Sequence, residues 1–232
     1  MKTAGRRQAI TACRGWMECL CALALAMLVA GSADAAGESG ATVSVRIYNY
    51  AKVSTRVMRG AEREAGRVFT AAGIDTMWVD CLASEAGVGS RLGLAEPAGT
   101  ANSDCSTPVN GVTVGLRLLS RSTIPSKDFS DEMFGFATGG DLASVFYQRV
   151  KDLAWGVDKD GNEIPLILGD VMAHELGHLL LGTNSHSPAG IMCANWDQDY
   201  LRLALRGHEL FSQEQSASMR ATLARKHAEL QP

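Results

Sequence analysis

The chain has 232 residues, of which 46% are hydrophobic and 20% are charged, and its formal net charge at pH 7 is −3. This length and composition predict one domain with a hydrophobic core. The sequence has no basic cluster, which argues against nucleic acid as a partner. No feature of the sequence indicates an oligomeric state.

The first 35 residues have the three parts of a secretory signal peptide. Basic residues come first, an apolar run follows over 20–30, and Ala33-Asp34-Ala35 is a small-x-small cleavage site. The apolar run is short for a bilayer span. We therefore expect cleavage near Ala35, a secreted or periplasmic location, and no stable membrane anchor after cleavage. Residues 36–232 would form a single domain.

The remaining cysteines are Cys81, Cys105 and Cys193. In an oxidising compartment such residues can pair. Because Cys81 and Cys105 flank a stretch rich in Gly, Ala and Ser, we predict that they form a disulfide that closes this loop. Three cysteines allow three single pairings, and in the predicted one Cys193 is free or paired with another chain.

In chain order, the sequence of the first half of the domain predicts several strands and one helix. A strand is expected over 42–50, followed by a helix over 55–72 that ends at Gly73 and by a second strand over 74–81. The segment 82–110 is expected to be a long loop. Two further strands are predicted, over 112–119 and 143–150.

The second half predicts helices. A mostly apolar helix is expected to begin near Pro165 and to end at Gly182, a natural left-handed stop. An irregular stretch follows, and Ser212 opens a final helix with Gln215 placed for a capping box. Met219, Leu223 and Leu230 would give this helix its core face, with His227 packing beside them. The expected class is α/β, a small twisted mixed sheet packed on two helices with a C-terminal helix.

The candidate metal-binding and catalytic residues lie in the segment His174-Glu175-Leu176-Gly177-His178. Two histidines four residues apart project from one face of a helix, so both rings can bind one metal ion. Glu175 lies one position further round, where it can face a metal-bound water. Both histidines could instead be core residues, but burying two imidazoles and a carboxylate without a metal is costly.

A catalytic zinc site usually has three protein ligands and a water. A chain reversal at Gly182 would bring His186 back as the third ligand. Zinc lowers the pKa of its bound water to about 7, and Glu175 would take the proton from that water and pass it to the leaving amine. These residues predict a hydrolase with a Zn²⁺ cofactor.

The segment 174–192 resembles the metzincin clan of zinc metallopeptidases, whose signature is HExxHxxGxxH followed by a methionine turn. The resemblance implies that His174, His178 and His186 bind zinc, that Glu175 is the general base and that Met192 lies in the methionine turn. The spacing differs from the signature, because three residues instead of two stand on each side of Gly182.

The resemblance also implies a zincin/metzincin-like fold in which residues 36–232 are the catalytic domain of a zinc metalloendopeptidase. In that clan an edge strand before the motif helix aligns an extended polypeptide substrate. The predicted strand over 143–150 would be its counterpart here.

Two other functions use the same residues. One is a zinc amidase that acts on a small or cell-wall amide, and the other is a non-catalytic binding module stabilised by zinc. Glu175 favours catalysis, because a structural zinc site is closed and needs no base. Of the neighbouring residues, Asp170 is a candidate partner of the metal ligands, Tyr200 a distant candidate for oxyanion support and Trp196 a core residue.

Overall fold

The computed structural model describes residues 41–81, 105, 111–120, 133–138 and 140–231. The predicted signal peptide and nearly all of the predicted loop over 82–110 lie outside these residues. The account of the fold below refers to the described residues alone.

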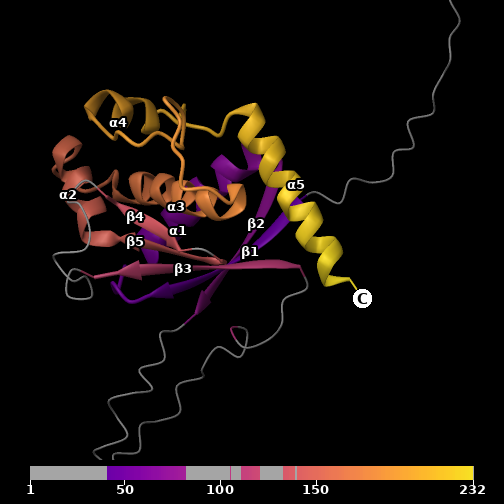
Figure 1. The fold of residues 1–232 in the computed structure, drawn as a ribbon. Coiled ribbons are helices and arrows are strands. Elements are labelled where there is room, and N and C mark those ends of the chain that lie inside the picture. The colour runs from indigo at the N-terminus through magenta and orange to yellow at the C-terminus, as the bar shows by residue number, and fades with distance from the viewer. Residues whose placement is uncertain (1–40, 82–104, 106–110, 121–132, 139, 232) are drawn as a thin grey trace, which may run out of the picture. The chain divides into compact units, whose positions relative to one another are not determined.

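A five-stranded mixed sheet forms one layer of the domain (Figure 1). The strands are β1 (Ala41–Asn49), β2 (Ile74–Cys81), β3 (Val112–Leu119), β4 (Gly135–Thr138) and β5 (Leu142–Phe146). They lie in the order β2-β1-β3-β5-β4, and every neighbouring pair is parallel except β4 with β5. The observed bounds of β2 and β3 are those predicted from the sequence. In β3, buried and partly buried residues alternate, so one face of the strand packs on the core.

Helices form the second layer, and α1 and α3 pack against the sheet (Figure 1). The helices are α1 (Thr55–Ala71), α2 (Tyr147–Val157), α3 (Ile164–Leu181), α4 (Gln198–Ala204) and α5 (Gln213–Leu230). The predicted α/β class, with a mixed sheet on two helices and a C-terminal helix, is confirmed.

The prediction of one strand over 143–150 is wrong. The strand β5 ends at Phe146, and α2 begins at the next residue and buries Val150 and Ala154, one helical turn apart. The strand β5 is also not an edge strand, since it lies between β3 and β4. The edge strand on this side of the sheet is β4, which the sequence analysis missed.

Close packing against α1 holds α3 in place. A Cβ atom at Gly60 would lie 2.5 Å from the Cβ of Pro165, and one at Gly169 would lie 2.6 Å from the Cβ of Glu64. Both distances are far inside van der Waals contact, so glycine at these positions lets the two helices approach. The length and composition of α3 alone would allow it to cross a membrane, but 83% of it is buried inside the domain.

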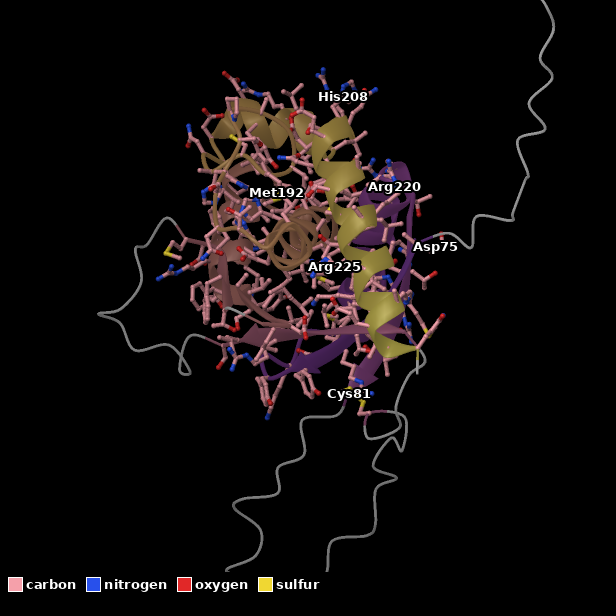
Figure 2. All side chains as sticks on the ribbon, turned by 45° about the vertical axis from the view of Figure 1, so that its right-hand side comes forward. Asp75, Cys81, Met192, His208, Arg220 and Arg225 are labelled. Carbon is pink, nitrogen blue, oxygen red and sulfur yellow. A yellow bond between two sulfur atoms is a disulfide. The ribbon has the colours of Figure 1, made fainter. Side chains whose placement is uncertain are left out.

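The helix α5 begins as predicted and ends differently. Ser212 and Gln215 form the expected capping box, and Met219 and Leu223 are fully buried. Leu230, predicted to be part of the core face, is 60% exposed. Arg220 donates a hydrogen bond from α5 to the carbonyl oxygen of Ala72, which ties the helix to the end of α1 (Figure 2).

The predicted disulfide between Cys81 and Cys105 is present, at the end of β2 (Figure 2). Cys193 is a free thiol and is partly buried. Its sulfur lies near the carbonyl oxygens of Pro188 and Asn195.

Candidate metal centre

The helix α3 brings three residues of the motif to one place. His174, Glu175 and His178 are 6%, 4% and 6% exposed, so the helix is buried on this face as well as on the face that meets α1. The helix ends at Leu181 and is capped by Gly182, whose φ of 66° is left-handed, as predicted. The N–H groups of Gly182 and Thr183 both donate to the carbonyl oxygen of His178.

Main-chain carbonyl groups orient the two helical rings. The Nδ1 atom of His174 lies 2.7 Å from the carbonyl oxygen of Ile191, and the Nδ1 atom of His178 lies 2.8 Å from that of Thr183. A carbonyl oxygen can only accept, so each Nδ1 carries the hydrogen and donates it. Each neutral ring therefore presents the lone pair of its Nε2 atom. Hydrogen bonds of this kind fix the tautomer of histidines that bind metals.

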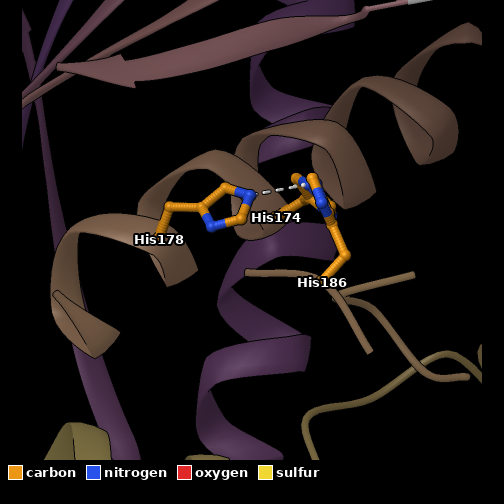
Figure 3. A group of neighbouring side chains, drawn as sticks. All are labelled: His174, His178 and His186. Atoms are coloured by element: carbon orange, nitrogen blue, oxygen red, sulfur yellow. Dashed lines mark hydrogen bonds between the residues drawn. The ribbon is translucent and has the colours of Figure 1, made fainter. Parts of the chain in front are cut away.

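The two lone pairs face each other. The Nε2 atoms of His174 and His178 are 3.1 Å apart (Figure 3). Burial lowers the pKa of His174 to about 4 and also lowers the pKa of His178, so both rings are neutral at pH 7. With both Nδ1 hydrogens already donated, neither Nε2 atom has a hydrogen to offer the other. A cation bound by both nitrogens resolves this contact.

The geometry fits zinc. Two nitrogens bound tetrahedrally at the usual zinc–nitrogen distance lie about 3.3–3.4 Å apart, close to the separation seen here. His186 joins the pair from the loop that follows α3, and the ligand atoms of the three histidines lie within 4.8 Å of one another (Figure 3). Its ring centroid is 5.2 Å from that of His174 and 4.9 Å from that of His178. The altered spacing around Gly182 therefore still brings the three rings together.

Met192, in the turn over 190–192, is fully buried (Figure 2). A Cβ atom at Gly177 would lie 2.7 Å from the sulfur of Met192, so the methionine contacts α3 at the turn between the two helical histidines. The N–H of Ile191 donates to the carbonyl oxygen of Leu210. The N–H of Gly190 donates to the carboxylate of Glu209. These bonds hold the Ile191 carbonyl that orients His174.

Glu175 lines a cleft that opens at the three histidines. The cleft has a volume of about 350 Å³. Burial raises the pKa of Glu175 to about 8, and its Oε2 atom has no hydrogen-bond partner. A Cβ atom at Gly135 would lie 2.7 Å from Cγ and Cδ of Glu175. Because Gly135 of β4 has no side chain, there is room for this carboxyl group. The sequence analysis missed Gly135.

The structure also places the neighbouring candidates. The ring nitrogens of His174 lie next to the carbonyl oxygen of Ile191 and to Nε2 of His178. Asp170 therefore does not orient this ring, which was the role considered for it. Trp196 belongs to the core, as predicted, but it also lines the cleft. Tyr200 packs on Trp196 with ring centroids 4.6 Å apart and is not among the residues that line the cleft.

The sequence matches no protein-family model, and no curated protein matches it. Among solved structures, the chain is similar to an archaemetzincin from Methanopyrus kandleri, with 16% identity over 81% of this chain and 98% of that one and a TM-score of 0.45. It is also similar to a zinc-dependent peptidase from Methanocorpusculum labreanum, with 17% identity over 75% of this chain and 99% of that one and a TM-score of 0.46.

Proposed function

We propose that this chain is a secreted zinc-dependent endopeptidase in which His174, His178 and His186 bind the metal and Glu175 is the general base. The observation that carries the proposal is the pair of buried Nε2 lone pairs that face each other 3.1 Å apart. Without a shared cation, two neutral rings gain no stabilisation from facing lone pairs. The third ring, from the loop, completes the usual three protein ligands of a catalytic zinc site.

A bound zinc ion would supply a Lewis acid that activates water and polarises the scissile carbonyl group. The part of Glu175, as the ionised carboxylate, is to accept a proton from the attacking water and to return it to the leaving amine. Burial raises the pKa of this carboxyl group, and the positive charge of a zinc ion bound in the same cleft would lower it again and favour the ionised form. The carboxyl group of Glu175 is suited to this role because Oε2 is directed to no other partner and lies in the same cleft as the three histidines. Because Gly135 has no side chain, β4 leaves space for the carboxyl group of Glu175.

An extended polypeptide can be bound along β4. This strand is last in the sheet order, so its outer edge pairs with no other strand of the described residues. Unpaired N–H and C=O groups at such an edge bind a peptide as an added strand. A second cleft of about 210 Å³ continues the first along β4 and shares Ala137, His178 and Asn184 with it. Substrate can therefore extend to both sides of the metal centre, as cleavage inside a chain requires.

The open cleft favours an enzyme over a binding module stabilised by zinc. A structural zinc site has four protein ligands and no room for substrate, whereas this site has three histidines at the floor of a cleft. An amidase acting on a small or cell-wall amide would use the same centre. The extended edge of β4 favours the peptidase.

The decisive experiment compares the parent protein with Glu175→Gln. We expect about one zinc ion per chain in both proteins, and a loss of about 10²- to 10⁴-fold in the cleavage of an unfolded protein substrate by the variant. Equal cleavage by the two proteins would overturn the role of Glu175. Hydrolysis of small amides without any cleavage of polypeptide would favour the amidase.

Secretion has its own test. Expression of the full chain in a bacterial host should yield an exported protein whose mass corresponds to cleavage near Ala35. Retention of the intact N-terminus inside the cell would contradict this part of the proposal.

A further inference from the structure

Two clefts meet at the metal centre, and Asn184 lies where they meet. The larger cleft, of about 350 Å³, holds Glu175 and the three histidines, and the smaller one, of about 210 Å³, continues beside β4. Three residues line both clefts, and each comes from a different element: Ala137 from β4, His178 from α3 and Asn184 from the loop after α3. A substrate that occupies both clefts therefore passes Asn184 at the metal centre.

The other neutral side-chain donors at the two clefts are already engaged. In the larger cleft, the indole N–H of Trp196 donates to a main-chain carbonyl oxygen. In the smaller cleft, the hydroxyl groups of Thr138 and Thr183 donate to neighbouring oxygens. The amide group of Asn184 has no hydrogen-bond partner among the described residues. Apart from the metal ligands, it is thus the one side chain in this part of the clefts with N–H groups to offer a ligand.

Hydrogen bonds on both sides hold the backbone of Asn184 in place. Thr183, before it, is joined to His178 twice, because its N–H donates to the carbonyl oxygen of His178 and its own carbonyl oxygen accepts from the Nδ1 atom. Ser185, after it, donates its N–H to the hydroxyl oxygen of Thr183 over 3.1 Å. Since His178 is a proposed metal ligand, these bonds fix Asn184 relative to the metal site. A donor that is held in advance needs little reorganisation during a reaction.

Glu175 and Asn184 reach the larger cleft from different walls. Glu175 packs against Gly135 of β4, whereas Asn184 belongs to the loop after α3. In the attack, the water oxygen bonds to the scissile carbonyl carbon and the proton of the water passes to Glu175. The electron pair of the C=O double bond moves to the carbonyl oxygen, which becomes an oxyanion. Because a carboxylate repels this charge, the oxyanion is directed away from β4 and toward the loop.

We infer that the side-chain amide of Asn184 donates a hydrogen bond to this oxyanion and is a second catalytic residue beside Glu175. The inference rests on the proposed peptidase function and deepens it. An oxyanion is a better acceptor than the neutral carbonyl oxygen of the substrate, so the bond is stronger in the transition state than in the ground state. The oxyanion support considered for Tyr200 thus falls to Asn184, since Tyr200 lines neither cleft.

The kinetics of Asn184→Ala, in the zinc-loaded protein as exported, test this role with a single peptide substrate. Loss of one oxyanion donor costs about 10²- to 10³-fold in kcat where such donors act without a metal, and a zinc ion would share the charge here, so we expect kcat to fall by at least about 10-fold. KM and zinc content should stay close to those of the parent. A rise in KM with kcat unchanged would mean that Asn184 binds substrate and transition state equally, and would overturn the inference.

Two further measurements separate oxyanion support from a structural effect. A phosphinic peptide carries a charged oxygen where the oxyanion forms, so its inhibition constant should rise in Asn184→Ala by the factor by which kcat/KM falls. Asn184→Asp keeps the shape of the side chain but places a carboxylate beside the oxyanion, so it should lose at least as much activity. An unchanged inhibition constant in Asn184→Ala, or full activity of Asn184→Asp, would overturn the inference.

Asn162→Ala is the matched control. Asn162 is exposed, lies before the first residue of α3 and lines neither cleft, so its replacement should leave kcat and KM unchanged. Cleavage that Glu175→Gln abolishes but that Asn184→Ala retains in full would overturn the inference alone. No cleavage of any peptide by the zinc-loaded parent protein would overturn the proposed function as well.

Discussion

The helical half and the loop half of the metal centre are held in place by different interactions. On α3, His174, Glu175 and His178 are buried and their backbone is fixed by packing against α1 and the sheet. In the loop, His186 is exposed, and the main-chain hydrogen bonds of the neighbouring turn fix the backbone around it. Because of this difference, we expect substitutions on α3 to change the free energy of unfolding. Substitutions in the loop should instead change metal binding and catalysis.

The largest effect is expected in the loop half, from His186→Ala. Removal of one of three ligands should abolish stoichiometric zinc binding and reduce peptide cleavage to background. Because the side chain is exposed, the free energy of unfolding of the metal-free protein should change by no more than about 0.5 kcal/mol. Metal analysis after dialysis and thermal denaturation measure the two quantities.

His208→Ala is the matched control for this prediction. His208 is also exposed and lies outside the group of three histidines (Figure 2). Its replacement should leave zinc content and cleavage unchanged. Full zinc and full activity in His186→Ala would show that His186 is not a ligand.

In the helical half, Gly177→Ala should destabilise the fold. The added Cβ atom would lie 2.7 Å from both the sulfur of Met192 and the ring of Phe211. Overpacking of this kind costs about 1–3 kcal/mol, which urea denaturation can measure. Gly156→Ala in α2 is the control, because no atom lies within 4 Å of its added Cβ, and it should stabilise the protein by about 0.5–1 kcal/mol. Equal effects of the two substitutions would contradict the packing of Met192 against α3.

A smaller effect connects the two halves through Glu209. Its carboxylate accepts the N–H of Gly190, in the turn whose Ile191 carbonyl orients His174. Glu209→Ala should therefore cost about 0.5–1.5 kcal/mol of unfolding free energy, the usual net contribution of one hydrogen bond. Glu209→Gln retains an acceptor oxygen and should recover most of this loss and the zinc affinity. An equal loss in the two variants would argue against this hydrogen bond.

The smallest effect is a pH dependence that arises on α3. Burial and the neighbouring Glu64 raise the pKa of Asp170 well above its usual value of 3.8. The folded protein therefore binds this proton more tightly than the unfolded chain does, and its stabilising effect is full below 3.8 and is lost as the pH rises toward the raised pKa. Asp170→Asn cannot ionise and should lose less stability over this range than the parent.

Denaturation with urea at a series of pH values measures this difference. Asp75→Asn, at an exposed position on β2, is the control and should follow the parent (Figure 2). If Asp170→Asn also followed the parent at every pH, Asp170 would not be protonated in the folded state.

Sequence patterns predicted the helical half of the centre well, because its signals are local. Pro165 and Gly182 mark the ends of α3, and the four-residue spacing of His174 and His178 places both rings on one face. The bounds of β2 and β3 were also predicted from their local sequences.

The parts of the site that depend on long-range contacts were not predicted. The strand β4 has only four residues and begins with glycine, so it gives no clear pattern, yet its Gly135 makes the room for Glu175. The apolar and aromatic residues of β5 continue past Phe146 into Tyr147 and Val150 of α2, so no local signal marks the change from strand to helix. The hydrogen bond from His174 to Ile191 joins residues 17 positions apart, and no local pattern encodes it.

The account depends above all on three imidazole ligands, and X-ray absorption spectroscopy of the zinc-loaded protein tests this most directly. We predict a first shell at about 2.0–2.1 Å that contains three imidazole nitrogens and a lighter oxygen ligand. A sulfur ligand at about 2.3 Å, as Cys193 would give, or only two imidazoles in the parent protein, would contradict the account.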